Sequence, residues 1–295
     1  MTGGNLKVWL ALLGTAFAWA STFHVAKHVV ALMPPMSSAM WRFGIASLFL
    51  IPVVTARERW DWAALRANSG WLIFLGGFGI AGFQLGMFYG LQTSSATNAS
   101  LIMALSPALT VVFAAVTGGE GISPTRWLGL ALGLIGVLIV ATHGSWEALA
   151  TLHFGSGDLW LAGGATTWAI YSVVLRRHVR GLTVLQLSAS TILVSAMTLC
   201  VLAAVAAPTQ LRLPPASAGW PLLFIGVVGS GFAYLWWNTG VMKLGAARAA
   251  SFMNLVPLFT MVIGLALGQS LSWAQVFGGE LVTAGVVMAT RETHA

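Results

Sequence analysis

The segment Ala96–Pro107 reads ATNASLIMALSP, and a related segment, AARAASFMNLVP, occupies Ala246–Pro257. Five of the twelve positions are identical, including the proline that ends each segment. The repetition continues in both directions from this pair at a spacing of 149 to 150 residues. Self-similarity at a fixed period is the signature of a duplicated structural unit. The 295-residue chain is therefore predicted to contain two copies of one unit, residues 1–145 and 146–295.

The composition indicates the environment of these units. Charged residues make up 7% of the chain and hydrophobic residues 58%, against roughly 25% and 45–50% in soluble domains. In a soluble protein the net charge of +7 would favour a nucleic-acid partner. Here the basic residues lie between long apolar runs, which is typical of an orientation signal facing anionic lipid. Membrane lipid is expected as a partner, and nucleic acid is not.

A helix that crosses a bilayer needs about 20 mostly apolar residues. The sequence predicts an all-α integral membrane protein with ten such helices, five in each unit, at 6–26, 35–55, 70–92, 95–117, 125–143, 157–176, 183–206, 218–241, 246–269 and 273–290. The run Val8–Phe17 followed by Ala18-Trp19-Ala20 also resembles a cleavable signal peptide. A modified copy of that triplet recurs around Trp168, inside the chain, so a mature first helix is favoured.

Lysine and arginine residues are distributed unevenly between the two predicted sides of the membrane. With a cytoplasmic N-terminus, the outer loops receive only Lys27 and Arg212. The inner side receives Lys7, Arg57, Arg59, Arg66, Arg126, Arg176, Arg177, Arg180, Lys243, Arg248 and Arg291. Such a bias follows the positive-inside rule. It predicts a multi-pass protein of the cell (inner) membrane with both termini in the cytoplasm.

An odd number of helices in each unit has a geometric consequence. The second unit must enter the membrane from the opposite side, so the units are expected to be related by an approximate two-fold axis in the membrane plane. Inverted repeats of this kind recur in secondary transporters, whose substrate sites lie near the midplane where the repeats meet. Structural duplication without transport is the alternative.

Three features carry a resemblance to a known family. They are Trp19 in the first predicted helix, Trp41-Arg42-Phe43 early in the second, and an alanine-rich fourth helix whose first half ends in Ser106-Pro107. With its twice-five repeat, the chain resembles the EamA-type branch of the drug/metabolite transporter superfamily, most closely the YddG-like amino-acid exporters. The resemblance covers essentially the whole chain. It implies a secondary transporter that exports small amphipathic metabolites, namely amino acids with a preference for aromatic ones.

Two tryptophans at mid-depth lead the candidates for a substrate site. Most others fall at predicted helix ends, where an amphipathic ring suits the interface, whereas Trp19 and Trp168 lie about two-thirds of the way along related helices. Phe23 and Tyr171 follow them by about one helical turn. We expect these rings to line a central cavity, and packing in the core or against lipid is the alternative. The predicted substrate-binding residues are Trp19, Phe23, His24, Phe83, Gln84, Met87, Ser100, Met103, Trp168, Tyr171, Trp237, Asn238 and Asn254.

Pro107 and Pro257 interrupt the fourth and ninth predicted helices at matching positions. Each proline removes one backbone hydrogen bond and pushes against the preceding turn. Interrupted helices in corresponding places of two repeats point to the site of a transporter. Both prolines are therefore predicted hinges, with a simple kink as the alternative.

Two charges fall inside predicted helices, Arg42 in the second and Glu280 in the tenth. A charge at the bilayer centre costs roughly 2.5–3.5 kcal/mol on insertion scales, so each needs water, a partner or, for Glu280, a proton. Both are candidate coupling residues. Arg42 could instead extend outward or line the outer vestibule, and Glu280 could be neutral, paired with Arg42 or a proton carrier.

The sequence offers no catalytic machinery. Its six histidines lack metal-ligand spacing, its carboxylates are not paired, and no glycine-rich loop suggests phosphate binding. We expect no enzymatic activity, cofactor or metal, and a monomer with a small-molecule substrate. The alternatives are an exporter of hydrophobic or cationic drugs and, from another class, an intramembrane enzyme or a non-transporting membrane scaffold.

Overall fold

Proline and serine residues set helix boundaries in the first unit. The structure, a computed structural model, describes residues 3–94, 96–117, 123–150, 153 and 155–290. Pro35 opens one helix, and Ser123 caps another by accepting a hydrogen bond from the N–H of Arg126. The first unit contains α1 (Gly3–Leu32), α2 (Pro35–Arg57), α3 (Trp62–Ala67), α4 (Ser69–Ile73), the π-helix η1 (Phe74–Ala81), α5 (Gly82–Thr93), α6 (Ala96–Ala104), α7 (Ser106–Val116), α8 (Pro124–Thr142) and α9 (Trp146–Ala150).

Comparable signals bound the helices of the second unit. The Thr183 side chain accepts a hydrogen bond from the N–H of Gln186, and Gly245, with φ of 97°, separates two helices in a conformation that other residues rarely adopt. The second unit contains α10 (Ser156–His178), α11 (Val184–Ala206), the 3-10 helix η2 (Pro208–Gln210), α12 (Ala216–Gly226), the π-helix η3 (Val227–Phe232), α13 (Ala233–Leu244), α14 (Ala246–Ser251), the 3-10 helix η4 (Phe252–Asn254), α15 (Leu255–Ala266) and α16 (Trp273–Thr290).

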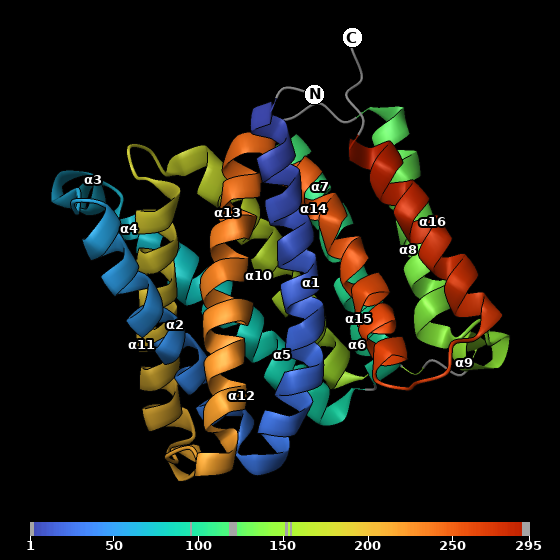
Figure 1. Cartoon of the computed structure of the whole chain (residues 1–295), viewed down its shortest axis with the longest axis horizontal. Coiled ribbons are helices and arrows are strands. Elements are labelled where there is room, and N and C mark those ends of the chain that lie inside the picture. Colours follow the sequence, from blue (N-terminus) through green and yellow to red (C-terminus); the bar gives the residue numbers. More distant parts are fainter. Residues whose placement is uncertain (1–2, 95, 118–122, 151–152, 154, 291–295) are drawn as a thin grey trace.

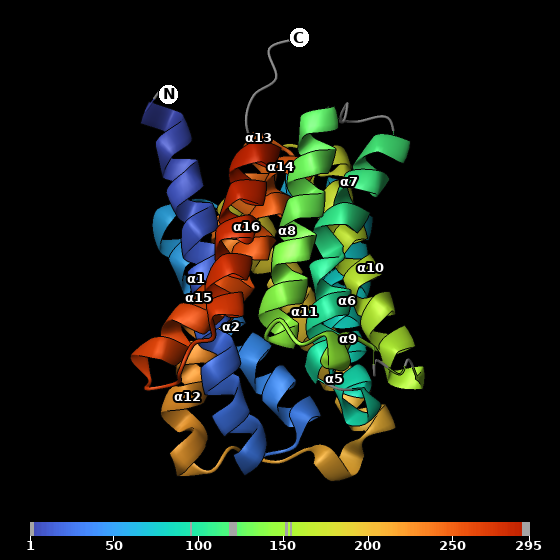
Figure 2. The same cartoon turned by 90° about the vertical axis from the view of Figure 1, so that its right-hand side faces the viewer.

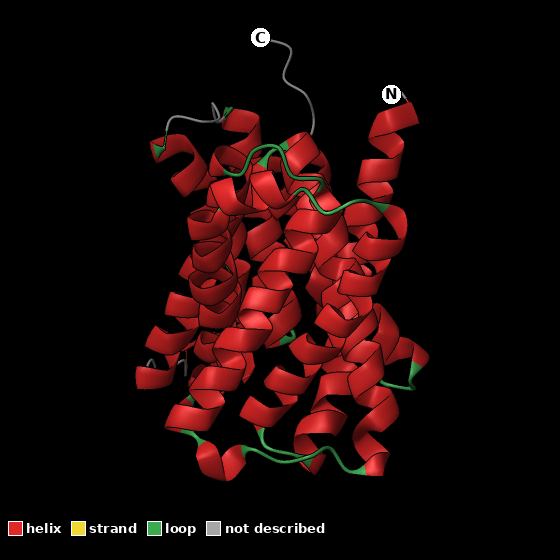
Figure 3. Ribbon diagram, turned by 90° about the vertical axis from the view of Figure 1, so that its left-hand side faces the viewer, coloured by secondary structure: helices red, strands yellow, loops and turns green. Residues whose placement is uncertain are grey.

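Helices are the only regular elements in the described part of the chain, where no strand occurs (Figure 3). Each predicted span overlaps a helical segment. Within the described residues, seven segments are long and apolar enough to cross a membrane by length and composition: Leu6–Leu32, Pro35–Arg57, Ser69–Thr93, Pro124–Thr142, Val184–Ala206, Ala216–Leu244 and Ala246–Ala266. The protein is accordingly a multi-pass membrane protein.

The helices run along one another in a bundle (Figure 1). At one edge α8 and α16 lie side by side (Figure 2), while α2 packs on α11 at the other. Between these edges, α1 packs on α13 and α15, and α10 packs on α5 and α7. The first turn of α1 and the last turn of α16 lie at the same end of the bundle.

Glycines make the contact between α8 and α16, and they make it twice. A side chain at Gly129 would collide with the carbonyl oxygen of Gly285, and one at Gly136 would collide with the carbonyl oxygen of Gly278. Gly278 and Gly285 each lie 149 residues after Gly129 and Gly136, respectively. The two contacts are therefore repeat-related images of each other. Small residues allow this close approach, which stabilises helix association within lipid.

Candidate functional site

The two repeat-related tryptophans meet in the middle of the bundle. The rings of Trp19, on α1, and Trp168, on α10, have centroids 5.3 Å apart and pack edge to face. Trp237, on α13, contacts both rings, at 5.5 and 5.3 Å. Trp168 also contacts the rings of Phe83, Tyr171 and Tyr234 at 5.3 to 5.6 Å. We call Trp19, Phe83, Trp168, Tyr171, Tyr234 and Trp237 the aromatic cluster.

The aromatic cluster is packed rather than open. Trp168 and Trp237 are each 1% exposed, and Tyr171 and Tyr234 are also buried. The sequence predicted that Trp168 lines a central cavity, but in this structure the space is filled by neighbouring rings from α1, α5 and α13. The aromatic side chains of both units converge on the same place, and their bulk closes it.

Polar groups in the centre form a short chain. The Tyr171 hydroxyl donates to Asn238 Oδ1 at 2.8 Å, and Asn238 Nδ2 donates to Ser188 Oγ at 2.9 Å. The indole N–H of Trp168 donates to the Met253 sulfur at 3.0 Å. Tyr171 and Asn238 were predicted site residues, and Ser188 joins them from α11.

Among the described residues, the buried polar atoms that lack a hydrogen-bond partner include Trp237 Nε1, Asn254 Oδ1 and Ser106 Oγ. Buried polar groups are usually paired, so unpaired ones near a candidate site are available to a ligand. Trp237 belongs to the aromatic cluster, whereas the Asn254 amide lies against α8 at Gly133. Gln84, on α5, is buried.

Arg42 reaches the π-helix η3. Its Nε donates to Ser230 Oγ at 2.6 Å, and an Nη donates to the Gly229 carbonyl at 3.1 Å. Trp19 Nε1 donates to the same carbonyl at 3.1 Å. The Arg42 guanidinium also lies 5.5 Å from the ring centroid of Phe43. The structure thus gives Arg42 neutral partners on α12–η3–α13 rather than the carboxylate of Glu280.

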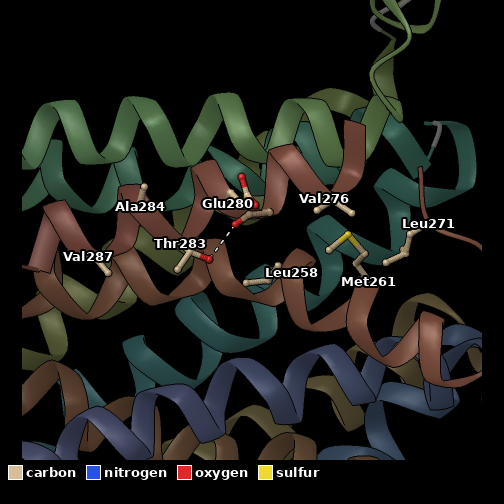
Figure 4. A pocket seen from close by; sticks show the side chains of 9 residues that line it. Leu258, Met261, Leu271, Val276, Glu280, Thr283, Ala284 and Val287 are labelled. Atoms are coloured by element: carbon tan, nitrogen blue, oxygen red, sulfur yellow. Dashed lines mark hydrogen bonds between the residues drawn. The ribbon is translucent and has the colours of Figure 1, made fainter. Parts of the chain in front are cut away.

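Glu280 lies in a different place, at a pocket between α15 and α16 (Figure 4). The pocket has a volume of about 630 Å³. Its lining is otherwise mostly apolar and consists of Leu258, Met261, Leu271, Val276, Gly279, Thr283, Ala284 and Val287. Glu280 itself is exposed.

Other predicted site residues lie outside the aromatic cluster. Phe23 is exposed, and His24 Nδ1 contacts the Ala20 carbonyl of its own helix. Met87 and Met103 pack in a separate apolar group with Ala99, Ile102 and Leu161. The side chain of Ser100 lies outside the described residues.

Both predicted hinge prolines follow an interruption in helical structure. Before Pro107, α6 ends at Ala104 and α7 begins at Ser106. Before Pro257, the 3-10 turn η4 separates α14 from α15. The interruptions lie at repeat-related places, as the repeat implies.

Sequence reasoning missed Tyr234, Ser188, Ser230 and Gly229. A signal existed for Tyr234, because it lies 150 residues after Gln84, a predicted site residue. Gly229 likewise lies 150 residues after Gly79, inside the related glycine-rich stretch. Ser188 and Ser230 had no distinguishing pattern. Among the described residues, no group of three or more His, Cys, Asp or Glu side chains could hold a metal ion.

The long apolar helices of the bundle define a multi-pass membrane protein. The model of the EamA-like transporter family matches residues 6–142 and again 155–291, and the chain belongs to this family. It is 36% identical to an uncharacterized transporter, YyaM, of Bacillus subtilis, over 97% of this chain and 94% of that one. It is 25% identical to a probable terminal-alkyne amino-acid exporter of Streptantibioticus cattleyicolor, over 97% of this chain and 94% of that one.

A solved crystal structure shares the fold. It superposes with a TM-score of 0.80 and 22% identity, over 96% of each chain. The family and the relatives carry names of transporters rather than enzymes. The protein is therefore a membrane transporter of the EamA family within the drug/metabolite transporter superfamily.

Proposed function

We propose that the protein exports amino acids, with a preference for aromatic ones, across the cell (inner) membrane by alternating access. The observation that carries this proposal is the meeting of Trp19 and Trp168, one from each unit, at 5.3 Å. Ring-to-ring contacts are worth about 0.5–1.5 kcal/mol per well-placed pair beyond area burial. A substrate ring that enters this contact can replace one protein ring by its own.

The repeat supports the transport geometry. Ten membrane-spanning helices in two inverted five-helix units would place both termini in the cytoplasm, in keeping with the uneven distribution of basic residues. The repeated contact of α8 with α16 fits a two-fold relation between the halves. Rocking of one unit against the other would separate Trp19 from Trp168 and open the aromatic cluster. Pro107 and Pro257 would serve as hinges at the interrupted helices.

One relative supports the substrate class. The Streptantibioticus protein is named as an amino-acid exporter, and it aligns along nearly all of this chain. Export of hydrophobic or cationic drugs is the competing function. Arg42, which is cationic and donates to the same carbonyl as Trp19, disfavours a cationic ligand at the aromatic cluster.

Energy coupling is proposed to involve Glu280. Its carboxyl group lines a pocket whose other walls are mostly apolar. This pocket is lined by α15 and α16, so protonation could alter how these helices pack. Transport driven by substrate gradients alone is the alternative.

Counterflow in proteoliposomes tests the proposal. Vesicles that contain only this protein and are loaded with unlabelled tryptophan should accumulate external labelled tryptophan faster than labelled alanine in alanine-loaded vesicles. Protein-free vesicles provide the baseline. Flux of neither amino acid above this baseline, together with flux of a cationic drug such as ethidium, would replace amino acids by the competing substrate class.

A further inference from the structure

The π-helix η3 leaves a backbone carbonyl for side chains to use. The N–H of Ala233 donates to Ser230 and Val228 and bypasses Gly229, the acceptor that a regular α-helix would use. The Gly229 carbonyl instead accepts from Trp19 Nε1 and from Arg42, each at 3.1 Å. Local π-helical turns of this kind are frequent at functional sites.

Arg42 satisfies this carbonyl without being neutralised. Its two hydrogen bonds go to Ser230 and Gly229, which carry no charge. A guanidinium has five N–H donors in a planar fork, so three remain without a partner among the described residues. Arg42 is half-buried. An uncompensated cation inside a membrane helix favours any anion that can reach it.

Arg42 lies beside the aromatic cluster. The neighbouring ring of Phe43 packs on Tyr234 with centroids 5.8 Å apart, and Tyr234 packs on Trp168 at 5.6 Å. Because Arg42 and Trp19 donate to one carbonyl oxygen, the guanidinium lies close to the edge of the Trp19 indole. A ligand with a ring in the cluster and an acidic group a few bonds away can contact both.

The charge of Arg42 occurs in only one of two repeat-related helix contacts. Gly76 lies against the backbone carbonyl of Thr191, and Gly226 lies against that of Arg42. The two glycines are 150 residues apart and their partners 149. The packing is thus repeated, but a buried threonine stands where the other half has arginine.

From these contacts we infer that Arg42 is the carboxylate-binding residue of the transport site. Its free N–H groups pair with a carboxylate in the bidentate manner that arginine favours, while the carboxylate-bearing molecule places its ring in the aromatic cluster. This inference rests on the proposed function and deepens it, since it assigns the acidic end of the substrate to one residue.

The test compares two probes that share a ring and differ in charge, indole-3-propionate and indole-3-propionamide. Isothermal titration calorimetry of the purified full chain should show at least tenfold tighter binding of the acid. Arg42→Gln should bring the two affinities within about twofold of each other. Arg42→Lys keeps the charge but loses the fork, and should reduce the preference at least threefold. Arg176→Gln is the matched control and should keep the full preference, because Arg176 also donates to two carbonyls, of Val241 and Met242, elsewhere in the bundle.

Specific results would overturn the inference. Equal binding of acid and amide by the unaltered protein would do so without any variant. A preference that survives in Arg42→Gln, or survives undiminished in Arg42→Lys if the glutamine variant does not fold, would also do so. Acid-selective, Arg42-dependent binding without tryptophan counterflow would defeat the proposed function and leave this inference standing. Tryptophan counterflow without a preference for the acid over the amide would support the proposed function and overturn the inference about Arg42.

Discussion

The π-helices of the two units, η1 and η3, have related backbones and different surroundings. Gly79 in η1 lies against the ring of Tyr171, whereas Gly229 in η3 lies against the hydroxyl of Thr22. Tyr171 lies 149 residues after Thr22, so the same contact is made with a different side chain. The Gly229 carbonyl of η3 accepts a hydrogen bond from a cationic side chain, Arg42. The close helix packing is thus the same in the two units, whereas the side chains that contact the two π-helices differ.

The two central tryptophans differ in the same way. Trp19 donates to the Gly229 carbonyl and is partly exposed, while Trp168 donates to the Met253 sulfur and is buried. A backbone carbonyl is a stronger acceptor than a thioether sulfur. The first-unit ring is therefore held by a hydrogen bond and the second-unit ring chiefly by packing.

The largest expected effect separates these two tryptophans. Trp168→Ala removes a ring that contacts five others and should lower the free energy of unfolding by about 3–5 kcal/mol. Trp19→Ala should cost less, because Trp19 is less buried. Thermal unfolding in detergent measures both. Equal losses would mean that the two units hold their tryptophan rings equally firmly, which would contradict the difference in burial between Trp19 and Trp168.

A smaller difference in stability is expected between alanine variants of Gly76 and Gly226, which lie three residues before Gly79 and Gly229, respectively. An added Cβ at Gly76 would meet the Thr191 carbonyl oxygen at 2.5 Å, while one at Gly226 would first meet the Ile45 side chain. Backbone cannot move aside as readily as a side chain. Gly76→Ala should therefore lose about 1–3 kcal/mol of stability, and Gly226→Ala less. The melting temperatures of the two variants test this order. A larger drop in melting temperature for Gly226→Ala than for Gly76→Ala would contradict it.

The hydrogen-bonded chain of the second unit should contribute less again. Tyr171→Phe leaves Asn238 Oδ1 without its donor in a buried place, which should cost about 1–3 kcal/mol, nearer the lower value because the amide can turn. Measuring the free energy of unfolding of Asn238→Ala and of the double variant as well completes a double-mutant cycle. Additive losses would show that Tyr171 and Asn238 act independently despite their 2.8 Å contact.

Glu280→Gln should change stability least, by less than about 0.5 kcal/mol, because the side chain is exposed. Its effect should appear in function. If Glu280 carries protons, the variant loses accumulation driven by a proton gradient and keeps downhill exchange. Ala131, 149 residues earlier, stands at the related place in the first unit, and Ala131→Gln serves as control. Undiminished accumulation by Glu280→Gln would reduce Glu280 to a structural role.

The sequence predicted the duplicated parts of the structure better than the unique ones. The pairing of Trp19 with Trp168 could be predicted because both sit at one position of a repeated pattern. Their close packing could not, since it depends on rotations of α1 and α10 that place five other rings around Trp168.

The hydrogen-bond partners of Arg42 could not be predicted from the sequence either. They depend on a π-turn, and the difference between π and α hydrogen bonding leaves little trace in a sequence beyond extra glycines such as Gly229 and Gly231. Met103 was a predicted site residue and its repeat mate Met253 was not, yet of the two it is Met253 that contacts a central tryptophan. A sequence repeat therefore predicts which positions correspond in the two units, but it does not predict which side chains contact them.

The reciprocal glycine contact of α8 and α16 bears on how such a chain arose. In a symmetric dimer, residue i of one copy touches residue j of the other and the reverse holds as well. Gly129 with Gly285 and Gly136 with Gly278 satisfy this rule once the 149-residue offset is removed. A free-standing single unit would thus carry a self-complementary face, so two separate polypeptides could associate through it before gene fusion joined them end to end.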